Sequence, residues 1–235
     1  MKEIKHPAKY TDSFICIFAE ILKDSKKILD PFAGTGKIAL IKDFGFCGEI
    51  YANEIEPEWI KPNKYNCDFI TTEDAEFLQY PDGFFDAICT SPTYGNRMAD
   101  HHIAKDGSKR NTYTHCIGRQ LSDGNTGKMQ WGSEYMEKHD RIYKHLASLV
   151  KNGGLFVCNV KNHIRKGKEI DVKSFHEESL KKRISKNKRN FCRIKRKRVR
   201  RKCGQKNNRR IHNGFPKDIK KGQHQNGAAL FLLCL

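Results

Sequence analysis

The feature that most constrains this chain is the alternation of short apolar runs with segments of helical periodicity. Apolar runs typical of buried strands occupy residues 26–30, 48–54, 67–71, 84–92 and 155–162. Helical spacing of apolar side chains occurs at 12–24, 37–45, 133–151 and 171–182, with glycines expected to end the second and third of these helices. Because strands that alternate with helices favour a doubly wound, mostly parallel sheet, we predict an α/β fold for residues 1–182.

The 235-residue chain carries a net charge of +18, but this charge is concentrated at one end. Residues 1–180 hold 25 basic and 26 acidic residues, whereas 181–235 hold 20 basic residues and one acid, Asp218. Residues 183–235 show no sustained period of 2 or 3.6. This tail is either a basic arm that binds nucleic-acid phosphates or the product of a reading-frame slip. We favour the slip, and we therefore expect incomplete C-terminal strands and no partner for the apolar run 228–235.

The chain has no signature of export. It contains no run of about 18 apolar residues that could form a membrane-spanning helix. The charged N-terminus is not followed by the apolar core of a signal peptide. The nine cysteines form no CxxC pair, and we interpret them as small buried thiols rather than as disulfides or zinc ligands. We therefore expect a cytoplasmic protein.

A glycine turn follows the first strand, in the segment Asp30-Pro-Phe-Ala-Gly34-Thr-Gly36. Glycines at such a turn let a ligand lie against the main chain and the start of a helix, although plain strand–helix packing would use them too. Glu54 ends the second strand, where a carboxylate can accept hydrogen bonds from both hydroxyls of a ribose; the alternative is a solvated acid like its neighbours. Asp74 follows the third strand, where it is either an acceptor for an adenine amino group or a turn residue.

Five motifs in this order resemble the amino-methyltransferases of DNA: HPAKYTDSFI (6–15), DPFAGTG (30–36), NEIEPE (53–58), EDA (73–75) and TSPTYGNR (90–97). The resemblance covers roughly residues 4–180. It implies a Rossmann-like fold and S-adenosylmethionine as the cofactor, with the N-terminal motif packed around the methionine end. The cofactor-binding residues that it implies are Tyr10, Asp30, Phe32, Gly34, Gly36, Glu54 and Asp74.

The fourth-strand motif implies the catalytic residues Ser91, Pro92 and Tyr94. An exocyclic amine of cytosine or adenine is a poor nucleophile because its lone pair is delocalised into the ring. The Ser91 side chain and the Pro92 carbonyl would each accept one amino hydrogen and so align the nitrogen, while Tyr94 would stack on a base flipped out of the duplex. Serine at this position resembles the N4-cytosine members, but N6-adenine stays open. The family has a second proline where this chain has Thr93, so we expect a less rigid loop.

Target recognition falls to the region after residue 94. We expect residues 95–132 to form a long irregular loop with a net charge of +3, which makes it the candidate contact with double-stranded DNA. Arg97 could reach a phosphate or a base edge, although a solvated charge is the more frequent case. Asn162 and His163 either line the base pocket or are a plain polar pair. No metal is expected, because His101 and His102 are adjacent and point apart.

The resemblance therefore implies a site-specific DNA methyltransferase in a bacterial or phage-infected cell, with or without a partner restriction enzyme. Two alternatives stay open. One is an RNA base methyltransferase, since related folds modify amines in RNA. The other is a degenerate domain that binds cofactor or nucleic acid without turnover, which Thr93 and the aberrant tail would suggest.

Overall fold

The computed structural model describes residues 6, 10–95, 112–165, 167–182, 192–194 and 228–234. Its helices are α1 (Asp12–Leu22), the 3-10 helix η1 (Lys37–Phe44), α2 (Pro57–Ile60), α3 (Tyr113–Ile117), α4 (Ser133–Leu149) and α5 (Val172–Lys181). The strands are β1 (Lys27–Asp30), β2 (Glu49–Asn53), β3 (Phe69–Thr71), β4 (Phe85–Thr90), β5 (Val150–Lys161), β6 (His163–Arg165), β7 (Lys168–Ile170), β8 (Cys192–Ile194) and β9 (Ala228–Cys234).

The main sheet has the order β3-β2-β1-β4-β5-β9-β8. Strands β1 to β5 pair in parallel, which confirms the predicted Rossmann-like doubly wound sheet. The strand order reverses between β1 and β4. At such a reversal the connections leave toward opposite faces, so a crevice opens beyond the carboxyl ends of the strands.

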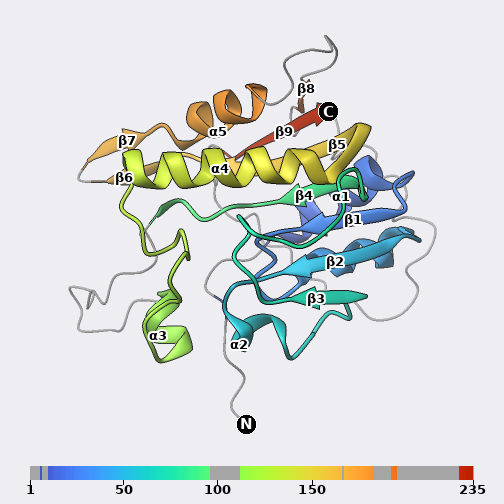
Figure 1. Cartoon of the computed structure of the whole chain (residues 1–235), viewed down its shortest axis with the longest axis horizontal. Coiled ribbons are helices and arrows are strands. Elements are labelled where there is room, and N and C mark those ends of the chain that lie inside the picture. The colour runs from blue at the N-terminus through green and yellow to red at the C-terminus, as the bar shows by residue number, and fades with distance from the viewer. Residues whose placement is uncertain are drawn as a thin grey trace, which may run out of the picture.

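Two apolar layers cover the sheet, with α4 and α5 on one side of it in Figure 1. Ile28 of β1 packs with α1 and η1, whereas the next residue, Leu29, packs with α4, as the alternation of side chains along a strand requires. The same alternation slips in β4 because a bulge lies between Phe85 and Ala87. Apolar side chains therefore pack on both faces of the strands that lead to the crevice.

Of the two helices that we expected glycines to end, η1 ends at its glycine and α4 does not. Gly45 closes η1 with φ 91°, and its N–H bonds to the carbonyls at the end of that helix, as expected. Gly153 and Gly154 were expected to stop the preceding helix, but they lie inside β5. A Cβ on Gly154 would lie 2.5 Å from Val150 Cγ1 and 2.7 Å from the Asp86 carbonyl oxygen, so its glycine serves close strand packing.

The expectation of incomplete C-terminal strands is wrong. Strand β9 pairs antiparallel with β5 from Leu155–Cys234 to Lys161–Ala228, and β8 pairs with β9 in turn. A continuous apolar run can cover a buried strand edge from a distant part of the chain, and no local pattern announces its partner. The rest of the basic tail, 183–191 and 195–227, lies outside the described residues, so its nature stays a prediction.

The loop predicted at 95–132 is only partly irregular. Residues 113–117 form α3, which is capped by Thr112, whose hydroxyl accepts the His115 N–H. Arg97, His101 and His102 lie outside the described residues, so the expectations placed on them stay predictions. Helix α3 packs on α2 through Tyr113, Trp59 and Leu121, which brings this segment to the carboxyl ends of the strands.

The helices and the cysteines bear on the expectation of a protein that is not exported and has free thiols. Among the described helices none is long and apolar enough to cross a membrane. Cys67, Cys89 and Cys158 are free and buried, as predicted, whereas Cys47 is free but exposed. Cys16 is disulfide-bonded, so the prediction of free thiols is wrong at that position.

Candidate active site

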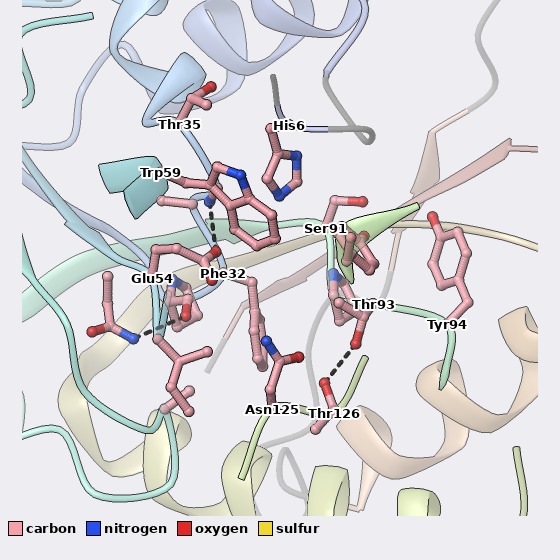
Figure 2. Close-up of a pocket in the computed structure, with 18 of the residues that line it drawn as sticks. His6, Phe32, Thr35, Glu54, Trp59, Ser91, Thr93, Tyr94, Asn125 and Thr126 are labelled. Atoms are coloured by element: carbon pink, nitrogen blue, oxygen red, sulfur yellow. Dashed lines mark hydrogen bonds between the residues drawn. The ribbon is translucent and has the colours of Figure 1, made fainter. Parts of the chain in front are cut away.

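A cavity of about 390 Å³ opens where the sheet order reverses, beyond the carboxyl ends of β1, β2, β4 and β5. Figure 2 shows several of its lining side chains. The cavity brings together eight of the ten residues predicted from the sequence: Tyr10, Phe32, Gly34, Glu54, Asp74, Ser91, Pro92 and Tyr94. Its volume lies within the range of small-molecule sites, roughly 300–1,000 Å³.

Asp30 lies behind the wall of this cavity rather than in it. Its carboxylate is fully buried and accepts hydrogen bonds from the Tyr10 hydroxyl (2.8 Å), the Thr90 hydroxyl (2.8 Å) and the Phe32 N–H (3.1 Å). Burial raises the pKa of Asp30 to about 6, although these three bonds work in the opposite direction. Asp30 therefore joins the ends of β1 and β4 to the N-terminal segment, and its effect on a ligand would be exerted through Tyr10.

Glu54 and the glycine turn form one unit. The Glu54 carboxylate accepts the Gly34 N–H (2.9 Å) with one oxygen and the Glu56 N–H (3.2 Å) with the other. Burial raises the pKa of Glu54 to about 7, with the two backbone N–H groups lowering it in part. Gly34 has φ 57°, and the His6 ring lies 3.1 Å from where its Cβ would be. Glu54, the predicted ribose acceptor, thus lines the cavity directly beside the glycine turn.

Gly36 has a packing role. It adopts φ 77°, and a Cβ there would lie 2.8 Å from the Cys67 sulfur. Gly36 does not line the cavity. Of the two predicted glycines, Gly34 is the one that a ligand can approach.

Asp74 lines the cavity and is ion-paired, which the sequence did not indicate. Lys138 of α4 donates to Asp74 Oδ2 (2.6 Å) and also pairs with Glu76 (2.8 Å). The Glu76 N–H donates to Asp74 Oδ1 (3.0 Å). The carboxylate is therefore held in one orientation, with lone pairs beyond those two bonds.

The Ser91 hydroxyl is oriented as an acceptor. It donates its hydrogen to the Asn159 carbonyl oxygen of β5 (2.9 Å), and the Asn159 side-chain amide lies 3.5 Å from the same hydroxyl oxygen. Because the proton is committed to a carbonyl and one lone pair faces the long 3.5 Å contact from the Asn159 amide, the other lone pair of Ser91 Oγ remains for a donor in the cavity. Asn159 lines the cavity and was not predicted from the sequence, since nothing local to it points to Ser91.

Thr93 stands at the position where the DNA amino-methyltransferases that this motif resembles have a proline, and it is anchored by hydrogen bonds. Its hydroxyl lies 2.5 Å from that of Thr126, and its carbonyl accepts the Tyr135 hydroxyl hydrogen. Tyr135 also contacts the buried His176 ring at 3.1 Å. We expected the loop to be less rigid because Thr93 replaces a proline. These hydrogen bonds restrain the loop instead. Tyr94, partly buried against the α4 side of the core, lies beyond Ser91 in Figure 2.

An aromatic wall that sequence reasoning missed closes the other end of the cavity. Trp59 lies 4.4 Å from the His6 ring and 5.5 Å from the Tyr113 ring, measured between centroids. All three residues line the cavity. They come from the N-terminal segment, α2 and α3, so no spacing in the sequence could have grouped them.

Asn162 belongs to the scaffold. Its amide donates to Glu169 (2.7 Å) and accepts the Lys173 N–H (2.9 Å), which ties the β6–β7 hairpin to α5. Neither Asn162 nor His163 lines the cavity, so of the two interpretations the polar pair is correct.

Neither a protein-family model nor a curated protein matches this chain. Solved structures with a similar fold include a protein from Bordetella parapertussis, at 8% identity over 93% of this chain and 66% of that one, with a TM-score of 0.50. The cyclase SpnF is 16% identical over 78% of this chain and 58% of its own, with a TM-score of 0.48. Human N-acetylserotonin methyltransferase in complex with S-adenosylmethionine is 10% identical over 94% of this chain and 51% of its own, with a TM-score of 0.49. The chain spans about half to two thirds of the length of these three proteins. At such identities the likeness shows the fold alone.

Proposed function

We propose that this protein transfers a methyl group from S-adenosylmethionine to an exocyclic amino nitrogen of a DNA base, N4 of cytosine or N6 of adenine. The observation that carries the proposal is the orientation of Ser91. Its oxygen is an acceptor at the edge of a cavity whose opposite side is suited to a nucleoside. An amine whose hydrogen bonds to such an acceptor is aligned rather than deprotonated, which is the form of assistance that a poor nitrogen nucleophile needs.

The residues around the glycine turn fit the cofactor chemically. Glu54 presents a carboxylate to the cavity, as two ribose hydroxyls require, and Gly34 lines the same cavity beside the His6 ring. Asp74 adds a second, oriented carboxylate for an amino group. When bound, S-adenosylmethionine supplies an electrophilic methyl group to the nitrogen, which then gives up one proton.

The choice of DNA rests on the motif resemblance and on the charge of residues 95–132. That charge supports the choice less than the sequence suggested. Arg119 is paired with Glu56 and Glu58, and Lys128 is paired with Asp123. The other cations of this segment, Arg97, Lys105, Lys109 and Arg110, lie outside the described residues, so their contact with phosphates stays a prediction.

Methylation with labelled cofactor tests the proposal. Wild-type protein is incubated in parallel with duplex DNA and with total RNA, and we expect label in the DNA. Ser91→Ala should lower that rate by at least about a hundredfold, because the aligned acceptor is lost, while binding of S-adenosylhomocysteine stays unchanged. Ser148→Ala is the matched control, since that hydroxyl bonds only within α4, to the His145 carbonyl, and lies outside the cavity.

Each of the other outcomes points to one alternative. Label in RNA alone would overturn the DNA assignment and favour an RNA base methyltransferase. Cofactor binding without label in either nucleic acid would favour a degenerate binding domain. Equal rates for Ser91→Ala and wild type would remove the observation on which the proposal depends.

A further inference from the structure

We propose that Glu56 is a positioning residue that joins the cofactor side of the cavity to the loop carrying Ser91. The inference rests on the proposed methyl transfer and extends it to a residue outside the cavity wall. Glu56 follows Glu54 by two residues and looked from the sequence like a solvated acid. In the structure its side chain is completely buried.

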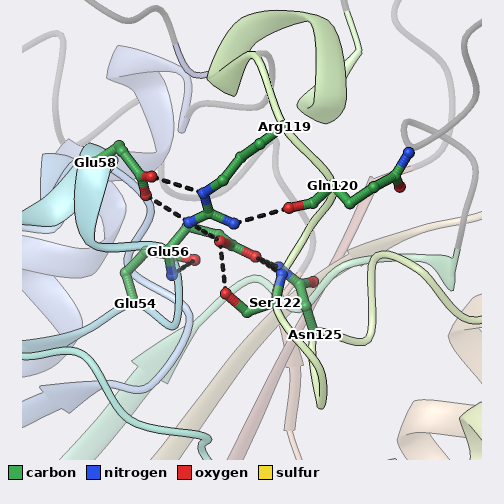
Figure 3. A network of polar contacts seen from close by, with 7 residues as sticks. All are labelled: Glu54, Glu56, Glu58, Arg119, Gln120, Ser122 and Asn125. Carbon is green, nitrogen blue, oxygen red and sulfur yellow. Dashed lines mark hydrogen bonds and ion pairs between the residues drawn. The ribbon is translucent and has the colours of Figure 1, made fainter.

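The Glu56 carboxylate is saturated by partners from one distant segment, as Figure 3 shows. One oxygen accepts the Ser122 N–H (2.7 Å) and the Asn125 side-chain amide (2.8 Å). The other accepts from Arg119 (2.8 Å) and from the Ser122 hydroxyl (3.0 Å). We call this set of four residues, Glu56, Arg119, Ser122 and Asn125, the Glu56 clasp. A buried carboxylate with four donors, one of them a guanidinium, fixes the segment that supplies them.

The clasp fixes both sides of the cavity. On the cofactor side, the Glu56 N–H donates to Glu54, and a Cβ on Gly124 would collide with Asp74, so Glu56 itself contacts one predicted cofactor carboxylate and the clasped segment lies against the other. On the substrate side, Asn125 is followed by Thr126, whose hydroxyl meets that of Thr93. Thr93 is two residues from Ser91. The path from Glu56 through Asn125 and Thr126 to Thr93 therefore consists of direct hydrogen bonds and one peptide link.

This arrangement gives the residues after α3 a role other than contact with nucleic acid. The Arg119 guanidinium is bonded to Glu56, Glu58 and the Gln120 carbonyl, so its charge is used within the protein. We infer that the segment 119–126 holds the Ser91 loop at the distance from the cofactor that methyl transfer requires. Glu56 acts through this segment and does not itself touch a reactant.

A double-mutant cycle with Glu56→Gln and Thr126→Val tests the path. Glu56→Gln replaces one carboxylate oxygen by an NH2 group, which would face donors of Arg119, Ser122 or Asn125 instead of accepting from them. Thr126→Val removes the hydroxyl that forms a hydrogen bond with Thr93. We expect each change to lower kcat by roughly tenfold. The double variant should fall little below the single ones, because both changes break one path. Cofactor affinity should weaken in Glu56→Gln and stay unchanged in Thr126→Val, and Thr126→Ser should recover most of the rate.

Glu58→Gln is the matched control. It removes an ion pair to the same arginine from a partly exposed side chain, and we expect kcat within about twofold of wild type. Effects of Glu56→Gln and Thr126→Val that simply multiply would overturn the proposal, since they would then be independent.

Amide hydrogen exchange separates this inference from the proposed function, because it requires no activity. Residues 91–95 should lose protection in Glu56→Gln and in Thr126→Val, and residues 119–126 should lose it in Glu56→Gln alone. Unchanged protection at 91–95 in Glu56→Gln would overturn the inference even if the wild type methylates DNA. A protein without methyltransferase activity in which 91–95 responds as expected would sustain the link and overturn only the proposed reaction.

Discussion

Glu54 is held in the fold at a cost in stability that depends on pH, and this cost can be measured. Burial raises the pKa of its carboxyl from 4.5 to about 7. Between these two values the folded protein binds a proton that the unfolded chain has released, so stability falls as the pH rises through this window. Below pH 4.5 the cost is absent, and above pH 7 it is fully present.

The pKa values set the size of the effect. At about 1.4 kcal/mol per pKa unit, a rise from 4.5 to about 7 corresponds to about 3 kcal/mol at pH 8, of which about 2.5 kcal/mol develops between pH 5 and pH 8. Glu54→Gln cannot ionise, so it does not have this dependence. The amide also opposes one of the two backbone donors, which costs about 1–3 kcal/mol at every pH. The change with pH, rather than the absolute stability, is therefore the quantity that isolates the carboxylate.

The assay is urea unfolding of wild type and Glu54→Gln at several pH values from 5 to 8. The difference in the free energy of unfolding should move by about 2.5 kcal/mol in favour of Glu54→Gln as the pH rises. Glu58→Gln is the control, because hydrogen bonding to Arg119 lowers the pKa of Glu58 below 4.5, so its contribution changes only at lower pH and its difference should stay nearly flat from pH 5 to 8. A difference for Glu54→Gln that stays flat from pH 5 to 8 would refute the reasoning.

The same variant should have the opposite effect on the cofactor. Two hydrogen bonds from ribose hydroxyls to a carboxylate, at about 1.5 kcal/mol each, predict that Glu54→Gln binds S-adenosylhomocysteine about a hundredfold more weakly at pH 8. Wild-type affinity should itself fall as the pH drops below about 7, where Glu54 becomes protonated. Calorimetric titration measures both. An affinity equal to that of the wild type would show that Glu54 does not contact the ligand.

Three further changes test the scaffold around the cavity. Asp74→Asn leaves the nearly buried Lys138 with one carboxylate instead of two, and urea unfolding should show a loss of about 1–2 kcal/mol; an unchanged midpoint would mean that Glu76 suffices. Tyr10→Phe removes a donor that lowers the pKa of Asp30, so stability above pH 6 should fall by about 1–2 kcal/mol, and a loss equal at pH 4 and pH 8 would contradict this. Deletion of 228–235 uncovers the edge of β5 and should promote aggregation in light scattering, whereas a monodisperse protein would argue against the pairing of β9.

Local patterns accounted for the parts of this fold that depend on neighbours in sequence. The strands of the parallel sheet and the turn at Gly34 each follow from residues that are near one another in the sequence. The same is true of Ser91, which a strand end presents to the cavity. For this reason eight of the ten predicted residues lie around one cavity.

Long-range contacts account for what the sequence did not predict. Glu56 looked solvated because acids flank it, and its partners lie 63 to 69 residues away. Lys138 meets Asp74 across 64 residues. Strand β9 pairs with β5 across 67 to 79 residues of sequence. Asp30 was assigned to the cofactor by a motif, and only the contacts of its carboxylate place it behind the wall.

The two acids that flank Ile55 differ in the one respect that separates a binding group from a structural one. Glu56 accepts four hydrogen bonds, one of them from a guanidinium, and has no capacity left for a ligand. Glu54 accepts two, both from backbone N–H groups, and no described cation is paired with it. A buried carboxylate left with free lone pairs is destabilising unless a ligand completes its shell. The incomplete shell of Glu54, beside the completed shell of Glu56, therefore argues that the cavity is built around a molecule with donors to offer.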